Sequence, residues 1–66
     1  MSSTGDLVAF AREKMKLYPA IKDDIWDSVR LASSEIEEGG DPVHECEMAE
    51  GHIMEMINDY KNGLPQ

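Results

Sequence analysis

The segment Gly39-Gly40-Asp41-Pro42 constrains the fold of this chain more than any other feature of its sequence. Glycine just past the end of a helix accepts the left-handed backbone conformation that stops the helix. An aspartate followed by a proline supplies the N-cap and the first residue of a new helix. The connection is so short that the two flanking helices are predicted to fold back on each other as an antiparallel hairpin.

Apolar residues on both sides of this segment recur at helical spacing. The expected helix over residues 19–38 carries a stripe of Ile21, Ile25, Val29, Ala32 and Ile36. The expected helix over residues 42–61 carries a stripe of Cys46, Ala49, Ile53, Met56, Ile57 and Tyr60, with Met54 at its edge as core filler. Spacings of three and four place such side chains on one side of a helix. The two stripes are therefore predicted to be buried against each other.

A further helix is expected over residues 4–17. Ser3 or Thr4 can cap its first turn through a hydroxyl, and Pro19 disfavours helical geometry at the residue before it. Its apolar residues form two stripes: Leu7, Val8, Ala11, Met15 and Tyr18 on one side, and Phe10 and Leu17 on another. We expect the first stripe to cover the helical hairpin and the second to contact another chain.

These expectations describe an all-α fold, a single small domain over residues 1–66 built as a short bundle of two to three helices. A core of this size is usually worth only a few kcal/mol, and burial against a second chain adds to it. Met48 stands on the polar side of its helix, so Phe10, Leu17 and Met48 are predicted to form an oligomer or partner interface. A two-fold homodimer is the simplest expectation.

The net charge of −8 is unevenly distributed along the chain. Residues 1–30 hold five acidic and five basic side chains, whereas residues 31–66 hold nine acidic side chains and the single base Lys61. Direct binding to nucleic acid or to an anionic membrane is disfavoured, because both require clustered cations. A protein partner with a basic surface is expected instead.

Seven carboxylates gather around the predicted connection between the last two helices. They are Glu35, Glu37, Glu38, Asp41, Glu45, Glu47 and Glu50. Asp41 and Glu45 suit the start of a helix, but the first three glutamates crowd a helix C-terminus, where the helix dipole disfavours negative charge. Because this arrangement opposes folding, we expect the seven carboxylates to form a partner-binding surface; the alternative is a solvated helix end.

His44 and His52 are the residues that a metal or small-ligand site would use. They are eight residues apart, about 12 Å along a helix and too far for both to bind one ion, so solvated surface histidines are the favoured interpretation. Cys46 is expected in the core, and neighbouring glutamates raise rather than lower the pKa of a thiol. We therefore expect no enzymatic activity, no metal and no cofactor.

The lone cysteine also bears on the compartment. Cys46 cannot form an internal disulfide and is typical of a reduced thiol in a cytoplasmic protein. Residues 1–6 lack the basic and apolar regions of a signal peptide. No apolar stretch approaches the roughly 18 residues of a membrane span. A cytoplasmic location is expected.

Three functional hypotheses follow from these features. The leading one is a small acidic interaction protein or inhibitor that docks on a basic protein surface. In its sharper form, the protein mimics DNA and its carboxylates take the place of phosphates on a nucleic-acid-binding protein. The alternative from another class is a small metal- or ligand-binding protein that uses His44 and His52. In size and charge, the chain resembles accessory proteins of phages and other mobile elements, and this resemblance implies occupation of a site on a host protein.

Overall fold

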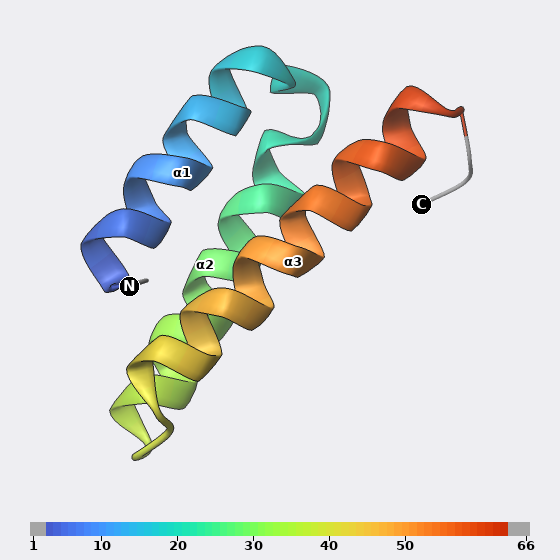
Figure 1. Cartoon of the computed structure of the whole chain (residues 1–66). Coiled ribbons are helices and arrows are strands. Elements are labelled where there is room, and N and C mark those ends of the chain that lie inside the picture. Colours follow the sequence, from blue (N-terminus) through green and yellow to red (C-terminus); the bar gives the residue numbers. More distant parts are fainter. Residues whose placement is uncertain (1–2, 64–66) are drawn as a thin grey trace.

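The computed structural model describes residues 3–63, and between them the chain forms helices and no strand (Figure 1). Three α-helices, α1 (Thr4–Leu17), α2 (Lys22–Glu37) and α3 (Pro42–Lys61), are joined by the 3₁₀ turn η1 (Pro19–Ile21) and by a short connection after α2. The predicted all-α class is therefore confirmed. None of these helices combines the length and the apolar character needed to cross a membrane.

The break between α1 and α2 is longer than the sequence predicted. Ser3 caps α1, because its Oγ accepts a hydrogen bond from the Asp6 backbone N–H at 3.2 Å. Tyr18 then leaves helical geometry, with φ −131° and ψ 65°. The helix expected over 19–38 is divided, because Ile21 N–H bonds to the Tyr18 carbonyl in a 3₁₀ turn that begins at Pro19. Proline fits the first turn of such a helix but donates no hydrogen bond, and α2 begins only at Lys22.

The connection between α2 and α3 is a Schellman motif followed directly by an N-cap. Gly39 adopts φ +103° and its N–H bonds to the Ile36 carbonyl at 3.0 Å, while Gly40 N–H bonds to the Glu35 carbonyl at 2.8 Å. These two bonds satisfy carbonyls that the end of a helix leaves without partners. The Asp41 side chain then accepts from His44 N–H at 3.2 Å and starts α3.

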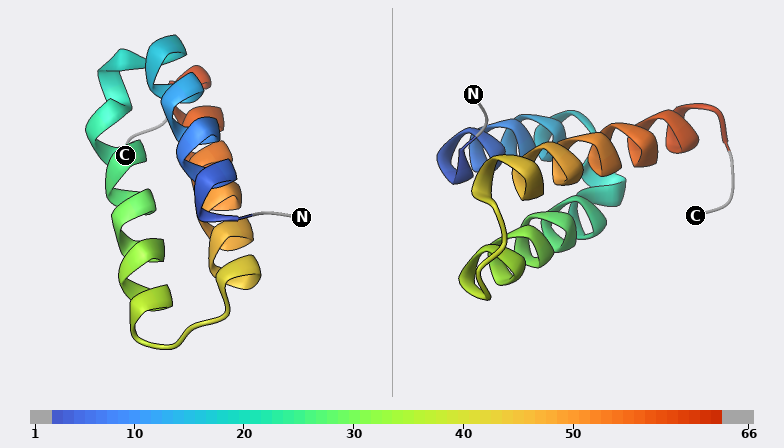
Figure 2. Two further views of the ribbon diagram at one scale, coloured as in Figure 1. Left: turned by 90° about the vertical axis from the view of Figure 1, so that its left-hand side faces the viewer. Right: turned by 60° about the horizontal axis from the view of Figure 1, so that its bottom comes forward.

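The connection brings α3 back alongside α2, and α1 packs against both helices (Figure 1, Figure 2). The buried apolar side chains come from all three helices and the 3₁₀ turn: Leu7, Ala11, Ile21, Ile25, Val29, Ala32, Cys46, Ala49, Ile53 and Ile57. Leu7, Ile25 and Ile53 are among the largest side chains that are fully enclosed. Every helix therefore contributes one stripe to a single core.

Two side chains of α3 lie further out than the sequence predicted. Tyr60 was expected to be buried and Met54 to fill the core, but 43% of Tyr60 and 47% of Met54 is exposed. Tyr60 lies in the last turn of α3, where it packs against Tyr18 in the break between α1 and η1 and not against a full helix. Met54 follows the buried Ile53 directly and so is rotated away from the core stripe.

Candidate functional site

The seven carboxylates singled out in the sequence lie around the connection between α2 and α3. We call this group of residues the acidic end: Glu35, Glu37, Glu38, Asp41, Glu45, Glu47 and Glu50. Glu45 and Glu50 are half-buried and the other five are exposed. The connection extends beyond the start of α1 (Figure 1). No helix of the described chain therefore covers the connection itself.

Among residues 3–63, no lysine or arginine forms an ion pair with the exposed carboxylates of the acidic end, which are Glu35, Glu37, Glu38, Asp41 and Glu47. The ion pairs of the described residues join Lys14 to Glu13 and Arg30 to Asp27. The last turn of α2 holds no basic residue. Because its final carbonyls already carry partial negative charge, the glutamates of that turn raise the free energy of the folded state.

A groove follows the line along which α2 and α3 meet, and we call it the seam groove. It consists of two adjoining hollows that share Ser28, Leu31 and His52. One hollow, of about 250 Å³, is completed mainly by Ala32, Met48 and Ala49, with Glu35 and Glu45 at its rim. The other is lined further by Asp24, Asp27, Glu55, Met56 and Asp59. Helix α1 contributes no residue to either hollow.

One hollow of the seam groove is mainly apolar and open to solvent. Leu31 of α2 is 66% exposed and Met48 of α3 is 58% exposed, and both line the same hollow. Met48 was predicted to be an interface residue from its place on a polar helix face, and Leu31 was not. That the two residues line one hollow depends on the relative rotation of the two helices, which the spacing within each helix does not specify.

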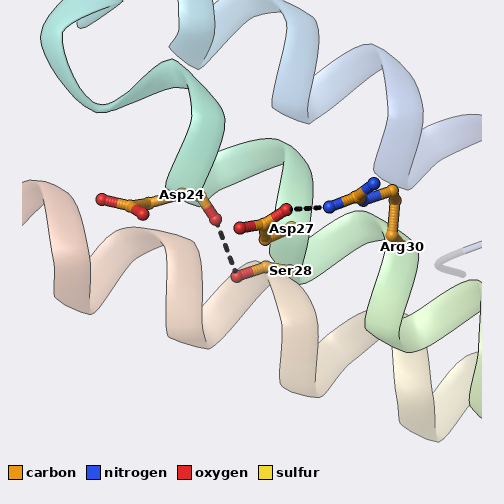
Figure 3. A network of polar contacts seen from close by, with 4 residues as sticks. All are labelled: Asp24, Asp27, Ser28 and Arg30. Atoms are coloured by element: carbon orange, nitrogen blue, oxygen red, sulfur yellow. Dashed lines mark hydrogen bonds and ion pairs between the residues drawn. The ribbon is translucent and has the colours of Figure 1, made fainter.

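Two of the groove's polar side chains have partners within α2 (Figure 3). The hydroxyl of the buried Ser28 donates to the Asp24 backbone carbonyl at 3.4 Å, one helical turn earlier. The Asp27 carboxylate pairs with Arg30, and both side chains are more than half exposed. An exposed pair of this kind contributes only about 0–1 kcal/mol, so a cation from another molecule can compete for Asp27.

The two α1 residues of the predicted interface lie in different surroundings. Leu17 is 60% exposed. Phe10, however, is half-buried against the core, with the Lys14 ammonium 5.3 Å from its ring centroid. Phe10 follows the buried Leu7 by three residues and therefore lies on the flank of the buried stripe. Phe10 and Leu17 consequently do not form one free apolar face.

The two histidines lie in different surroundings. His52 lines the centre of the seam groove, whereas His44 is exposed in the first turn of α3, where its backbone N–H is bonded to Asp41. Within residues 3–63, no three His, Cys, Asp or Glu side chains are grouped closely enough to hold a metal ion. The arrangement does not join His44 and His52 into one site.

The thiol of Cys46 lies fully inside the core. Burial raises the pKa of the Cys46 thiol, a hydrogen bond with the Thr4 side chain opposes this rise, and the nearby carboxylates of Glu50, Asp6 and Glu45 add to it. A thiol with a raised pKa carries less of the nucleophilic thiolate at neutral pH. Its environment therefore favours a packing role.

Comparisons with family models, with curated proteins and with solved structures found no match to this chain.

Proposed function

We propose that this protein is a non-enzymatic interaction protein that binds a basic surface of a protein partner and acts by occupying that surface, as an inhibitor does. One observation carries the proposal: Glu35, an exposed carboxylate that forms no ion pair with a described lysine or arginine, lines the same hollow as the exposed apolar residues Leu31 and Met48. The framework is the antiparallel hairpin of α2 and α3, and α1 supports it from outside the seam groove.

The two kinds of surface have different roles in such a complex. Complementary charge accelerates association and selects the partner, whereas buried apolar side chains supply most of the affinity. The acidic end provides the complementary charge, and the seam groove provides the apolar side chains. Acidic surfaces repel phosphate, so a direct nucleic-acid or membrane ligand fits the charge less well than a basic protein.

Capture of partners by the immobilised protein tests the proposal. A triple variant, Glu37→Lys with Glu38→Lys and Glu47→Lys, serves as the comparison, because all three side chains are exposed. We expect a partner that the wild-type protein retains at low salt, that about half-molar salt releases, and that the triple variant binds with a slower association rate. A partner whose affinity survives both changes contradicts the proposal.

A DNA-mimicking inhibitor is a special form of the same proposal. In that form, duplex DNA and this protein compete for one site on the captured partner. If DNA and this protein bind the partner at the same time, the DNA-mimic form of the proposal is wrong, but the general proposal is not contradicted.

Self-association is a second candidate, favoured by the exposure of Leu17, Leu31 and Met48. Each copy carries a charge of −8, so repulsion opposes a homodimer most strongly at low salt. A dimer should therefore strengthen as salt rises from about 50 to 500 mM, whereas a complex with a basic partner should weaken. Sedimentation of the isolated protein at the two salt concentrations distinguishes the candidates, and a monomer at both concentrations contradicts the dimer.

A further inference from the structure

One hollow of the seam groove is lined mainly by apolar side chains, with Ser28 and His52 beside them, and we call it the apolar centre. Leu31 of α2 and Met48 of α3 line it together with the small side chains of Ala32 and Ala49. Because alanine is smaller than the exposed Leu31 and Met48, an apolar ridge of another molecule can pack into this hollow.

Carboxylates stand at both ends of this apolar centre. At one end lie Asp24, Asp27, Glu55 and Asp59, and at the other Glu35 and Glu45. No lysine or arginine is among the described residues that line the groove, although Arg30 pairs with Asp27 beside it. The groove therefore fits an occupant that is apolar in its middle and cationic at both ends.

The length of the groove limits the kind of occupant. Along α3 it extends from Glu45 to Asp59, which is about 21 Å at 1.5 Å per residue. A helix of about four turns has this length and can present an apolar ridge with cations at its two ends. An amphipathic helix laid in a groove is also a recurring mode of peptide recognition.

We propose that the seam groove binds a basic amphipathic helix of the partner, with its apolar ridge between Leu31 and Met48 and its lysines or arginines against the carboxylates at both ends. This inference rests on the proposed function and specifies the partner's chemistry. A second copy fits less well, since it would bring its own carboxylates into the groove.

Binding of designed peptides to the full chain tests the inference. The probe is a helical peptide of about 16 residues with leucines on one face and lysines in its first and last turns. A scrambled peptide of identical composition keeps the charge and removes the apolar face. We expect fluorescence anisotropy to show at least about tenfold tighter binding of the ordered peptide. Amide NMR shifts should concentrate at Leu31, Met48 and their neighbours. Equal affinity of the two peptides overturns the inference.

Variants of the apolar centre provide the second test. Leu31→Glu combined with Met48→Glu should weaken peptide binding by about tenfold or more, because both side chains are exposed yet line the groove. Leu17→Glu is the matched control, since Leu17 is equally exposed but lies on α1. Unchanged circular dichroism shows that the fold persists in each variant. Equal losses in the groove variant and the control overturn the inference.

Neutralised carboxylates provide the third test. Asp24→Asn with Glu55→Gln and Asp59→Asn should weaken peptide binding and reduce its dependence on salt. The matched control is Glu37→Gln with Glu38→Gln and Glu47→Gln, which removes three exposed charges outside the groove. We expect this control to change the affinity by less than about twofold at physiological salt, where charges are screened beyond about 8 Å. A larger loss in the control than in the groove variant overturns the inference.

These outcomes separate the inference from the proposed function. If a captured partner is lost on reversal of Glu37, Glu38 and Glu47 while the peptide leaves the groove amides unshifted, the groove inference is wrong and the proposed function stands. If no partner binding depends on charge and no peptide binds, both are wrong. If Leu31→Glu with Met48→Glu converts a dimer into a monomer, the groove belongs to a second copy and the inference is overturned.

Discussion

The rings of Tyr18 and Tyr60 meet edge to face, with centroids 6.1 Å apart and an interplanar angle of 82°. Tyr18 occupies the break between α1 and η1, and Tyr60 lies in the last turn of α3. The contact therefore joins two segments far apart in the sequence at the end of the molecule away from the acidic end. Tyr60 remains 43% exposed despite this contact.

Removal of this contact should lower stability by a measurable amount. Aromatic pairs of this geometry contribute about 0.5–1.5 kcal/mol beyond their buried area. We expect Tyr60→Leu to lower the free energy of unfolding by about this amount, measured by urea denaturation followed through Trp26 fluorescence. A double-mutant cycle with Tyr18→Leu isolates the pair. A coupling energy of zero contradicts a stabilising contact.

Ile53 should be one of the most sensitive positions in the core. It is fully buried, whereas the adjacent Met54 is 47% exposed. Ile53→Ala should cost about 2–5 kcal/mol through the cavity that it leaves, which is enough to unfold much of a domain this small. Met54→Ala serves as the matched control and should cost far less. Similar melting midpoints for the two variants would show that the buried face of α3 is assigned wrongly.

Alanine substitutions of three glycines should change the stability of the fold in different directions. Gly39→Ala is unfavourable because of its φ of +103°, and a Cβ on Gly40 would lie 2.8 Å from the Glu35 carbonyl oxygen. Gly51 lies within α3 with nothing near its Cβ position, so Gly51→Ala should stabilise by about 0.5–1 kcal/mol. Thermal unfolding of the three variants measures the order of their stabilities. Destabilisation by Gly51→Ala contradicts this account of α3.

The buried thiol should make stability fall at alkaline pH. Below the ordinary thiol pKa of about 8.5, Cys46 is neutral in both states and has no effect. Above that pH the unfolded thiol ionises, whereas burial raises the pKa of Cys46 in the folded state. The free energy of unfolding therefore decreases as pH rises, until the folded thiol also ionises. Cys46→Ala should lack this component, and identical pH slopes for the two proteins contradict it.

Charge reversal at the end of α2 should separate stability from binding. Glu37 and Glu38 oppose the helix dipole, so Glu37→Lys with Glu38→Lys should stabilise the fold by roughly a few tenths of a kcal/mol each at low salt. The same double variant should slow association with a basic partner. Chemical denaturation and binding kinetics measure the two effects. A loss of stability shows that these glutamates do not oppose folding.

The sequence by itself determined most of the helix ends and most of the core, although α2 begins at Lys22 and not at Pro19. The residues that start or stop the helices act on backbone groups within about four residues of themselves, as Ser3, Pro19, Gly39 and Asp41 do. Their effects can therefore be predicted from the local sequence. The all-α class and the buried stripes follow from apolar spacing in the same way. The grouping of carboxylates around one connection could also be predicted, because it depends only on where one helix ends and the next begins.

Only the tertiary structure decided which exposed side chains share a surface. Leu31 and Met48 line the same hollow because α2 and α3 pack with one particular rotation and register, which periodicity within a single helix does not specify. The same packing buried half of Phe10 and left Tyr60 and Met54 partly exposed. A stripe fixes which side of a helix faces the core, but the neighbouring helix decides how far that side is covered.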